Sequence, residues 1–237
     1  MIEVTILKKS KISFLTTIFP NNSEYLYDFF ESLKVQTFKD FDVVVVNDGY
    51  ERFCDIKKRY NKYLNIIEIK YSNNPAKNRE QGVNFCINSN YEILIFGDSD
   101  DYFADNRVEK SIELLKNNEI VFNDLNLFDI NGVYEKKYIS NRLSNNDVID
   151  FEFIKDKNVL GMSNTALKLK NVSNVKFNSK IIAVDWFFFK NLLSKGLKAI
   201  FTNQTVSYYR QHKNNLVGLN REGDMYYLWW EKRKTDK

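Results

Sequence analysis

Three aspartates gather directly after a hydrophobic run in the segment IFGDSDDYFADNRVEKSIELL, residues 95–115. Asp98, Asp100 and Asp101 surround Ser99, and a stretch with helical spacing follows them. Carboxylates two residues apart at the end of a strand can bind one hard cation together. Mg²⁺ and Mn²⁺ prefer oxygen ligands and keep waters or substrate phosphates in their remaining positions. The segment therefore predicts a divalent metal site formed by Asp98 and Asp100.

A purely structural role for these acids is the alternative. Side chains before RVEKSIELL can cap the helix that follows, because they accept hydrogen bonds from its free amides and complement its dipole. Asp105 or Asn106 is sufficient for that role and does not require the acids further upstream. An EF-hand calcium loop is excluded: counting from Asp98, Tyr102 stands at a ligand position and Phe103 at the position of the required glycine.

The rest of the sequence excludes several other kinds of site. It contains neither a Walker lysine motif nor G-x-G-x-x-G, so the glycine-rich loops that cradle phosphates are absent. One histidine, His212, and two cysteines, Cys54 and Cys86, cannot assemble a zinc site of ordinary composition, and we expect both cysteines to be reduced. The net charge of +4, from 35 basic and 31 acidic residues with interspersed signs, argues against a nucleic-acid partner.

The first half of the chain alternates short apolar runs with stretches of helical spacing. The runs predict strands at 12–18, 42–46, 66–69, 92–96 and 119–122. Between them, apolar residues at helical spacing predict amphipathic helices, such as one with Phe53, Ile56, Tyr60 and Tyr63 on a single face. This alternation predicts an α/β fold with a parallel sheet covered by helices. Ligands of such sheets bind at the carboxyl ends of the strands, where the acidic segment is expected.

The second half is richer in Asn and Lys and has a looser pattern. It predicts a hairpin near Asn131 and Gly132, a helix over 185–195 that ends at Gly196, and a strand over 198–209. A length of 237 residues with 43% apolar residues favours one domain. We find no secretory signal pattern and no apolar run near the ~18 residues of a membrane span, so we expect a cytoplasmic protein.

The order of several motifs resembles the family 2 glycosyltransferases, which have the GT-A fold. The motifs are ISFLTTIFPNN, SLKVQTFKDFDVVVVNDG, AKNREQG, EILIFGDSDD and AVDWFFFKNLLSKGLK, spread over about residues 10–210. The resemblance implies a single Rossmann-like domain with a mixed, mostly parallel sheet flanked by helices. Its nucleotide-binding half would span about residues 10–124 and its acceptor half about 125–215, followed by a tail at 216–237.

The resemblance also implies an activity and a role for each of several side chains. The enzyme would be inverting and would transfer a sugar, with a UDP sugar as the expected donor, to a hydroxyl of a glycan or lipid-linked acceptor in bacterial surface polysaccharide synthesis. Donor binding would fall to Thr17, Phe19, Asp48, Arg79, Asp98 and Ser99. Mn²⁺ or Mg²⁺ would bind Asp100 and Asp98, with His212 as a further candidate ligand, and Asp185 would be the general base.

Plainer interpretations of the donor-side residues stay open. Asp48 precedes Gly49 and this pair is common in turns. Arg79 has Glu80 and Asp101 as alternative partners on the surface. A sugar nucleotidyltransferase is a further enzymatic alternative, but FLTTIFPNNSEY lacks the glycine-rich basic phosphate loop that such enzymes usually have.

The acceptor side and the tail also have alternatives. Asp185 can simply cap its helix, and Val184 stands where the family usually has another acid, which leaves open a binding domain without turnover. His212 can be an ordinary polar surface residue. The tail MYYLWWEKRKTDK, residues 225–237, combines aromatic and basic residues that can dock peripherally at an anionic membrane. The alternative is a terminal helix packed on the domain.

Overall fold

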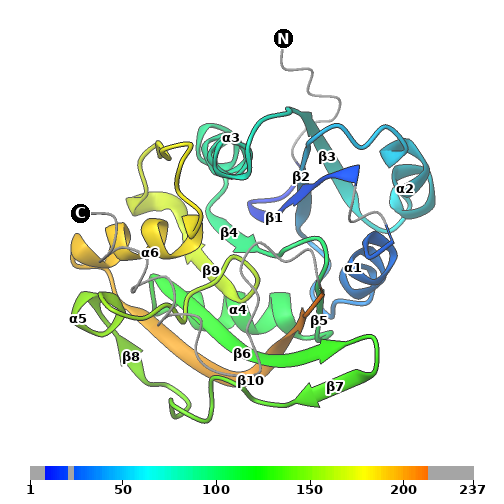
Figure 1. The fold of residues 1–237 in the computed structure, drawn as a ribbon. Helices are drawn as coiled ribbons and strands as arrows, with labels where there is room; N and C mark the ends of the chain where they lie inside the picture. Colours follow the sequence, from blue (N-terminus) through cyan, green and yellow to red (C-terminus); the bar gives the residue numbers. More distant parts are fainter. Residues whose placement is uncertain (1–8, 21–23, 213–237) are drawn as a thin grey trace.

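A mixed β-sheet runs through the molecule, and helices lie on both of its faces (Figure 1). The computed structural model describes residues 9–20 and 24–212. The strands are β1 (Ile12–Ile18), β2 (Asp42–Asn47), β3 (Asn65–Lys70), β4 (Ile93–Phe96), β5 (Tyr102–Phe103), β6 (Ile120–Asp129), β7 (Gly132–Glu135), β8 (Val148–Ile149), β9 (Thr165–Lys168) and β10 (Ala199–Arg210). The helices are α1 (Leu26–Lys34), α2 (Phe53–Tyr60), α3 (Pro75–Asn88), α4 (Arg107–Leu115), α5 (Phe151–Ile154) and α6 (Val184–Ser194).

The order of the strands creates a crevice beside β4. The main path of the sheet is β3-β2-β1-β4-β9-β6-β10-β5, with β7 on β6 and β8 on β10. The first four strands are parallel, β9 is antiparallel to both β4 and β6, and β6 is parallel to β10. The chain proceeds outward from β1 to β3 and then crosses to the other side of β1 to form β4. Such a reversal leaves room for a ligand at the carboxyl ends of the two strands.

Two hydrophobic cores hold the helices against the sheet. Val44 and Val46 face the core that contains residues of α3 and α6, whereas Val43 and Val45 face the core that contains residues of α1, α2 and α4. A strand with helices on both faces needs apolar residues in both directions, and this explains the continuous run of valines in β2. The sequence interpretation of a helix-covered α/β sheet is confirmed, with a mixed sheet as the resemblance implied.

The elements of the first half lie close to their predicted positions, with one error in α2. That helix ends at Tyr60, and Tyr63 lies beyond it with 49% of its surface exposed, so Tyr63 does not belong to the buried face. The face of Phe53, Ile56 and Tyr60 is buried as expected. Three residues past the helix end, the 3.6-residue period no longer determines where a side chain points.

The second half contains more regular structure than the sequence indicates. The hairpin is confirmed, with Asp129 opposite Gly132 and a positive φ of 105° at Gly132. The helix α6 and the strand β10 are confirmed as well, and Gly196 follows α6 with φ of 93°. The prediction that the strand at 119–122 ends there is wrong, because β6 continues to Asp129. The short strand β9 was not predicted.

The tail at 216–237 lies outside the described residues, so the predictions for it stay untested. None of the helices in the described part of the chain has the length and apolarity that a membrane-spanning helix requires. Cys54 is exposed and Cys86 is buried, and both are free thiols.

Candidate active site

The candidate site begins at Gly97, the residue that follows β4. A Cβ atom at this position would lie 2.4 Å from Cε1 of Phe14 and 2.6 Å from Cζ of Phe103, so the two rings leave space only for glycine. Beyond it the chain turns, and the amide of Asp101 donates a hydrogen bond to the carbonyl of Asp98 over 3.1 Å. This turn follows β4 directly at the crevice, as the sequence predicts.

Asp98 forms an ion pair across the crevice. Arg79, in α3, donates from Nη2 to Oδ1 of Asp98 over 3.0 Å. Glu80 instead pairs with Lys77 over 2.7 Å, so the alternative pairings proposed for Arg79 are wrong. Burial raises the pKa of Asp98 and the nearby charges of Asp100 and Asp185 add to this effect, although the Arg79 guanidinium opposes it.

Asp101 has a different surrounding from its neighbours. It is fully buried, and its carboxylate accepts hydrogen bonds from the hydroxyl of Ser163 and, over 2.7 Å, from the backbone amide of Arg210. Burial raises the pKa of Asp101 well above its usual value, and the negative charges of Asp100 and Asp98 act in the same direction. Asp101 therefore anchors the acidic segment to β10 and to the segment before β9.

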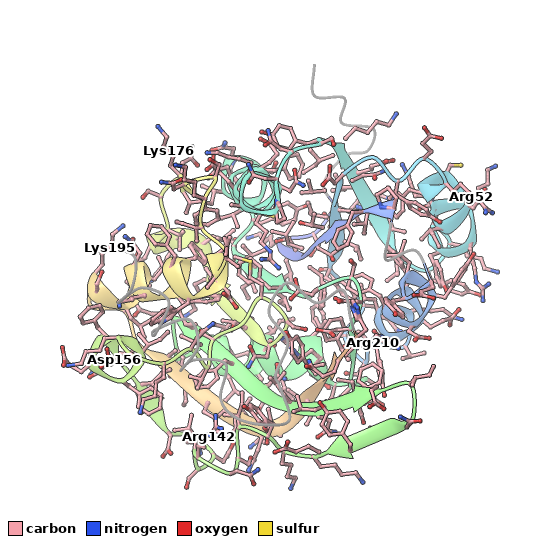
Figure 2. The ribbon with its side chains drawn as sticks, in the orientation of Figure 1. Arg52, Arg142, Asp156, Lys176, Lys195 and Arg210 are labelled. Atoms are coloured by element: carbon pink, nitrogen blue, oxygen red, sulfur yellow. The ribbon has the colours of Figure 1, made fainter. Side chains whose placement is uncertain are left out.

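Asp100 lies next to the only histidine of the chain. Nε2 of His212 is 2.9 Å from Oδ2 of Asp100, and both side chains are largely buried. Arg210 holds the same residue from the other side, because its Nε donates to the carbonyl of Asp100 over 2.7 Å. The guanidinium of Arg210 also pairs with Asp28 over 2.6 Å and lies 4.4 Å from the ring centre of Tyr25, and Figure 2 shows Arg210 near β5.

The donor set fits a divalent cation bound mainly by substrate and water. Within residues 9–20 and 24–212, no group of three or more His, Cys, Asp or Glu side chains could hold a metal ion. Mg²⁺ is usually bound through one or two carboxylates plus substrate phosphates, so the carboxylates of Asp100 and Asp98 would be a sufficient protein contribution. Asp98 also lies close to the negative charges of Asp100 and Asp185, and a bound cation would relieve the repulsion among these carboxylates.

The loop after β2 supplies Asp48 at the same edge of the sheet. Its carboxylate accepts hydrogen bonds from Oγ of Ser72 over 2.5 Å and from Nδ2 of Asn78 over 2.8 Å. The turn predicted for Asp48 and Gly49 is also present, and Gly49 has a φ of 82°. By contrast, Nδ2 of Asn47 donates to Oε1 of Glu68 over 2.7 Å and so links β2 to β3.

The remaining donor-side predictions fall at the ends of β1 and β4. Thr17 lies in β1 beside Val46 of β2 and is half-buried, and Phe19 follows the strand with similar exposure. Ser99 lies within the acidic turn and is only 2% exposed. All three lie in or directly after the strands that border the crevice.

Asp185 lies in the first turn of α6 and faces the acidic segment. Its Oδ1 accepts a hydrogen bond from the amide of Trp186 over 2.7 Å, so it does bind the start of its helix. Its charge also reaches the opposite wall: burial disfavours the Arg79 cation, but Asp98 and Asp185 together hold the pKa of Arg79 above its usual value. The N-cap of α6 is Ala183 and has no capping side-chain hydrogen bond, so the prediction that Asp185 caps the helix is wrong, although its negative charge lies in the first turn.

Asn106, in contrast, does not cap α4 as predicted. It stands at the N-cap position without a capping side-chain hydrogen bond, and its Nδ2 donates to the carbonyl of Gln204 over 3.1 Å.

Three residues of the site were not found in the sequence. Ser163 and Arg210 hold the acidic segment, as described above, and Tyr209 lies beside it. Burial raises the pKa of Tyr209 well above its usual value, and the charges of Asp101, Asp98, Asp100 and Asp185 raise it further. The available signal was the sequence SYYR at the end of a predicted strand, where polar side chains meet the site.

Comparisons with known proteins agree on one family. Residues 15–174 match the family model described as "Glycosyl transferase family 2". The chain is 27% identical over 199 residues to the UDP-Glc:alpha-D-GlcNAc-diphosphoundecaprenol beta-1,3-glucosyltransferase WfaP of Escherichia coli, covering 83% of this chain and 76% of that protein. It is 24% identical over 243 residues to the uncharacterized glycosyltransferase MJ1057 of Methanocaldococcus jannaschii, covering 96% and 82%.

Solved structures share the fold at lower identity. S. aureus TarS 1-349 in complex with UDP-GlcNAc has a TM-score of 0.66 and 17% identity, over 86% of this chain and 59% of that one. The mannosyltransferase PcManGT from Pyrobaculum calidifontis in complex with GDP-Man and Mn2+ has a TM-score of 0.57 and 13% identity, over 94% and 60%. The chain thus spans about three fifths of these solved chains. With the family model covering most of its length, the chain belongs to glycosyl transferase family 2 and has the GT-A fold.

Proposed function

We propose that this chain transfers a hexose-like sugar from a UDP sugar to a hydroxyl group of a glycan or lipid-linked acceptor, with inversion at the anomeric carbon. The names of the E. coli relative and of the TarS complex, which include UDP-Glc and UDP-GlcNAc, support a UDP sugar as donor. Production of a bacterial surface polysaccharide on the cytoplasmic side of the membrane is part of the same proposal.

One observation carries this proposal: Asp185 and the acidic segment after β4 act on the same arginine. Asp98 pairs with Arg79 directly, and Asp185 favours the charged form of Arg79 from α6. A donor diphosphate beside Asp98 and Asp100 would therefore place its sugar near Asp185. Proximity of a carboxylate to the reacting hydroxyl is the first requirement for a general base.

The inverting reaction requires only one base from the protein. The acceptor oxygen attacks the anomeric carbon, the bond from that carbon to the diphosphate oxygen breaks, and Asp185 accepts the hydroxyl proton. Because the attack and the departure occur on opposite faces of the sugar, the configuration inverts in one step. No covalent nucleophile is needed, which agrees with the absence of a G-x-S-x-G motif.

The donor would be bound by the residues at the strand ends. Asp48, Thr17 and Phe19 are proposed to contact the nucleoside, and Arg79, Asp98 and Ser99 the diphosphate side. Mn²⁺ or Mg²⁺ is proposed to bind Asp100, with Asp98 and His212 as further ligands. When bound, a divalent cation offsets the negative charge that develops on the leaving diphosphate.

A thermal-shift panel tests this proposal. We would measure the Tm of the full chain with UDP, GDP, CDP, dTDP and ADP, each with and without Mn²⁺. A ligand at 100 times its Kd stabilises by about 2.7 kcal/mol, and each kcal/mol raises the Tm of a domain of this size by roughly 2–4 °C. We expect a shift with UDP that needs Mn²⁺ and is lost in Asp100→Asn.

The matched control is Asp105→Asn, which changes an exposed aspartate before α4. This variant should retain the UDP shift of the wild type. The absence of a shift with every nucleotide would contradict the proposed donor site, and a shift with GDP alone would correct the donor base.

A binding module without turnover is the second candidate, and Val184 favours it because the family usually has an acid there. Asp185→Ala separates the two functions. An enzyme should lose transfer and keep the UDP shift, whereas a binding module should bind the donor and show the same slow donor hydrolysis in both proteins.

A further inference from the structure

Arg107 is a charged residue in the interior of the molecule. It begins α4, which packs against β6 and β10 (Figure 1), and it is only 1% exposed. Among the described residues no carboxylate pairs with its guanidinium, and Nη2 has no hydrogen-bond partner there. Burial lowers the pKa of Arg107 to about 9, so the side chain is still a cation at pH 7.

A buried cation of this kind is costly for stability. Removal of a charge from water has a large free-energy cost, which a partner charge or a full set of hydrogen bonds can offset. Arg107 donates from Nη1 to Oγ of Ser111 over 2.8 Å and from Nε to Oγ of Ser207 over 3.3 Å. The guanidinium has five N–H donors, so these contacts leave it poorly satisfied. Stability alone therefore does not explain an arginine at this position.

The contact with Arg107 helps to determine where the hydroxyl of Ser207 points. A serine hydroxyl has one proton to donate and two lone pairs that accept. Oγ of Ser207 accepts from Nε of Arg107 and, over 3.2 Å, from Nδ2 of Asn123. With both lone pairs in use, its proton is directed to the carbonyl oxygen of Ser163, which is 2.8 Å away.

Ser163 connects this interior group with the candidate active site. Its own hydroxyl donates to the carboxylate of Asp101, which is fully buried. The amide of Asp101 in turn donates to the carbonyl of Asp98 over 3.1 Å and closes the acidic turn. Contacts thus lead without a gap from Arg107 through the two serines to the acidic segment. We call Arg107, Ser207 and Ser163 the serine relay.

We propose that Arg107 and Ser207 are positioning residues that set the affinity of the acidic segment for a divalent cation and its nucleotide. They hold Ser163, and Ser163 holds Asp101, which keeps the turn in the conformation that presents its other carboxylates to one cation. A charged donor forms a stronger hydrogen bond than a neutral one, which gives the buried cation its use. This inference rests on the proposed function, because it concerns the donor site of the same reaction.

Two serine-to-alanine variants test the proposal, because both serines accept a hydrogen bond from Arg107. Ser207→Ala breaks the serine relay. Ser111→Ala removes a hydroxyl that is just as buried but bonds Arg107 within its own helix. With the full chain at a fixed UDP concentration, we measure the Mn²⁺ concentration that gives half of the thermal shift. Residues that orient a metal ligand contribute roughly 10–100-fold to metal affinity.

We expect Ser207→Ala to raise this Mn²⁺ concentration by about 10-fold and Ser111→Ala to leave it unchanged. In the transfer assay, Ser207→Ala should raise the KM for Mn²⁺ and leave kcat at saturating Mn²⁺ unchanged, because the proposed base stays in place. Equal Mn²⁺ dependence in the two variants would overturn the proposal, as would a lower kcat with an unchanged KM for Mn²⁺.

A double-mutant cycle tests whether the two serines act in series. Ser163→Ala should raise the Mn²⁺ concentration for half of the shift at least as much as Ser207→Ala. The double variant Ser163→Ala/Ser207→Ala should then be no weaker than Ser163→Ala alone, because residues that act through one another are not additive. Additive effects would show that Ser207 does not act through Ser163 and would overturn the relay.

Arg107→Met separates positioning from stability. Methionine fills the interior without a charge, so the Tm without ligand should stay close to that of the wild type. The Mn²⁺ concentration for half of the UDP shift should rise as it does in Ser207→Ala. A lower Tm with unchanged Mn²⁺ dependence would mean that Arg107 contributes to stability alone and would overturn its positioning role.

Hydrogen exchange in the ligand-free protein gives a readout that requires neither metal nor nucleotide. The amides of residues 98–101 should exchange faster in Ser207→Ala than in Ser111→Ala, because the acidic turn opens locally once its anchor is loose. A wild type without any UDP shift counts against the proposed function, and hydrogen exchange still decides whether the serine relay holds the turn. A UDP shift together with equal exchange in both variants overturns this inference alone.

Discussion

The two sides of the candidate site differ in how firmly their side chains are held. On the donor side, Asp48, Asp98 and Asp101 each accept hydrogen bonds from side chains of other elements, and Asp101 is fully buried. On the acceptor side, Asp185 accepts from the amide of its own neighbour, and Ile182 and Phe187 are open to solvent. The donor side is preorganised, and the acceptor side has its contacts still to make.

This difference matches what each side would recognise under the proposed function. A nucleotide and its cation are small, polar and highly charged. Polar side chains that are already fixed can bind them without the free-energy cost of ordering those side chains. An acceptor with a long apolar part is bound through contact area, which requires exposed apolar surface and few fixed partners. The comparison can be tested by variants that act on one side at a time.

The largest effect should come from Asp185→Asn. Loss of a general base lowers rates by roughly 10²–10⁴-fold, so transfer should fall by about that factor. The Mn²⁺-dependent UDP shift should stay as in the wild type, because the amide keeps the size of the side chain and Arg79 keeps its ion pair with Asp98. The measurement is the steady-state transfer rate together with the Tm in the presence of UDP.

Asp150→Asn is the matched control for that variant. Asp150 also lies at the start of a helix, where its Oδ1 accepts from the amide of Phe153 over 3.1 Å. A similar loss of transfer in Asp150→Asn would mean that removal of a carboxylate at the start of a helix, and not loss of a base, explains the effect at Asp185.

A pair of glycines allows the two sides to be compared by stability. Gly97→Ala places a methyl group within 2.6 Å of the buried rings of Phe14 and Phe103, and overpacking of this kind costs about 1–3 kcal/mol. Gly161→Ala meets Oδ1 of Asn164 at 3.2 Å and Oδ2 of Asp185 at 3.8 Å. We therefore expect Gly97→Ala to lower the Tm clearly and Gly161→Ala to lower it less.

For Gly161→Ala we expect a larger effect on transfer than on stability. Its new methyl group would contact the Asp185 carboxylate, so transfer should fall by more than the stability loss explains, and urea unfolding beside the transfer assay measures both. An equal loss of stability in the two variants would contradict the idea that the acceptor side is less tightly packed.

The sequence was sufficient to predict the strands of the first half of the chain, which are buried on both faces. Strands such as β2 are covered on both faces, so Val43–Val46 have to be apolar and the run is unmistakable. The position of the site followed from the same reasoning, because the acidic segment comes directly after β4. The pairing of Arg79 with Asp98 across the crevice, by contrast, was not predicted from the sequence.

The parts that could not be predicted depend on contacts between distant segments. Strand β9 is the four-residue sequence TALK, too short for any period to appear. Within β6, Asn123 and Asp124 are buried polar residues, and Asp124 is satisfied by amides of Ile139 and Ser140 that no local pattern indicates. Because these polar residues interrupt the apolar run, the sequence predicts a shorter strand than β6.

The three aspartates of the acidic segment show the same limit at the site. The sequence predicts Asp98 and Asp100 as metal ligands and assigns Asp101 no role. The distinction comes from Ser163 and Arg210, which are 62 and 109 residues away from Asp101 and turn it into an anchor. Roles within a cluster of identical side chains are thus set by tertiary partners.

The smallest expected effect concerns one methylene group at two isoleucines. Ile66→Val, in the buried strand β3, should destabilise by about 0.5–1.5 kcal/mol, because it leaves a small cavity. Ile182→Val, at a position with 60% exposure just before α6, should change stability by less than about 0.5 kcal/mol. The two free energies of unfolding come from parallel urea titrations. A cost at Ile182 equal to that at Ile66 would mean that this side chain is packed against something in the free protein, and the acceptor side would then be as preorganised as the donor side.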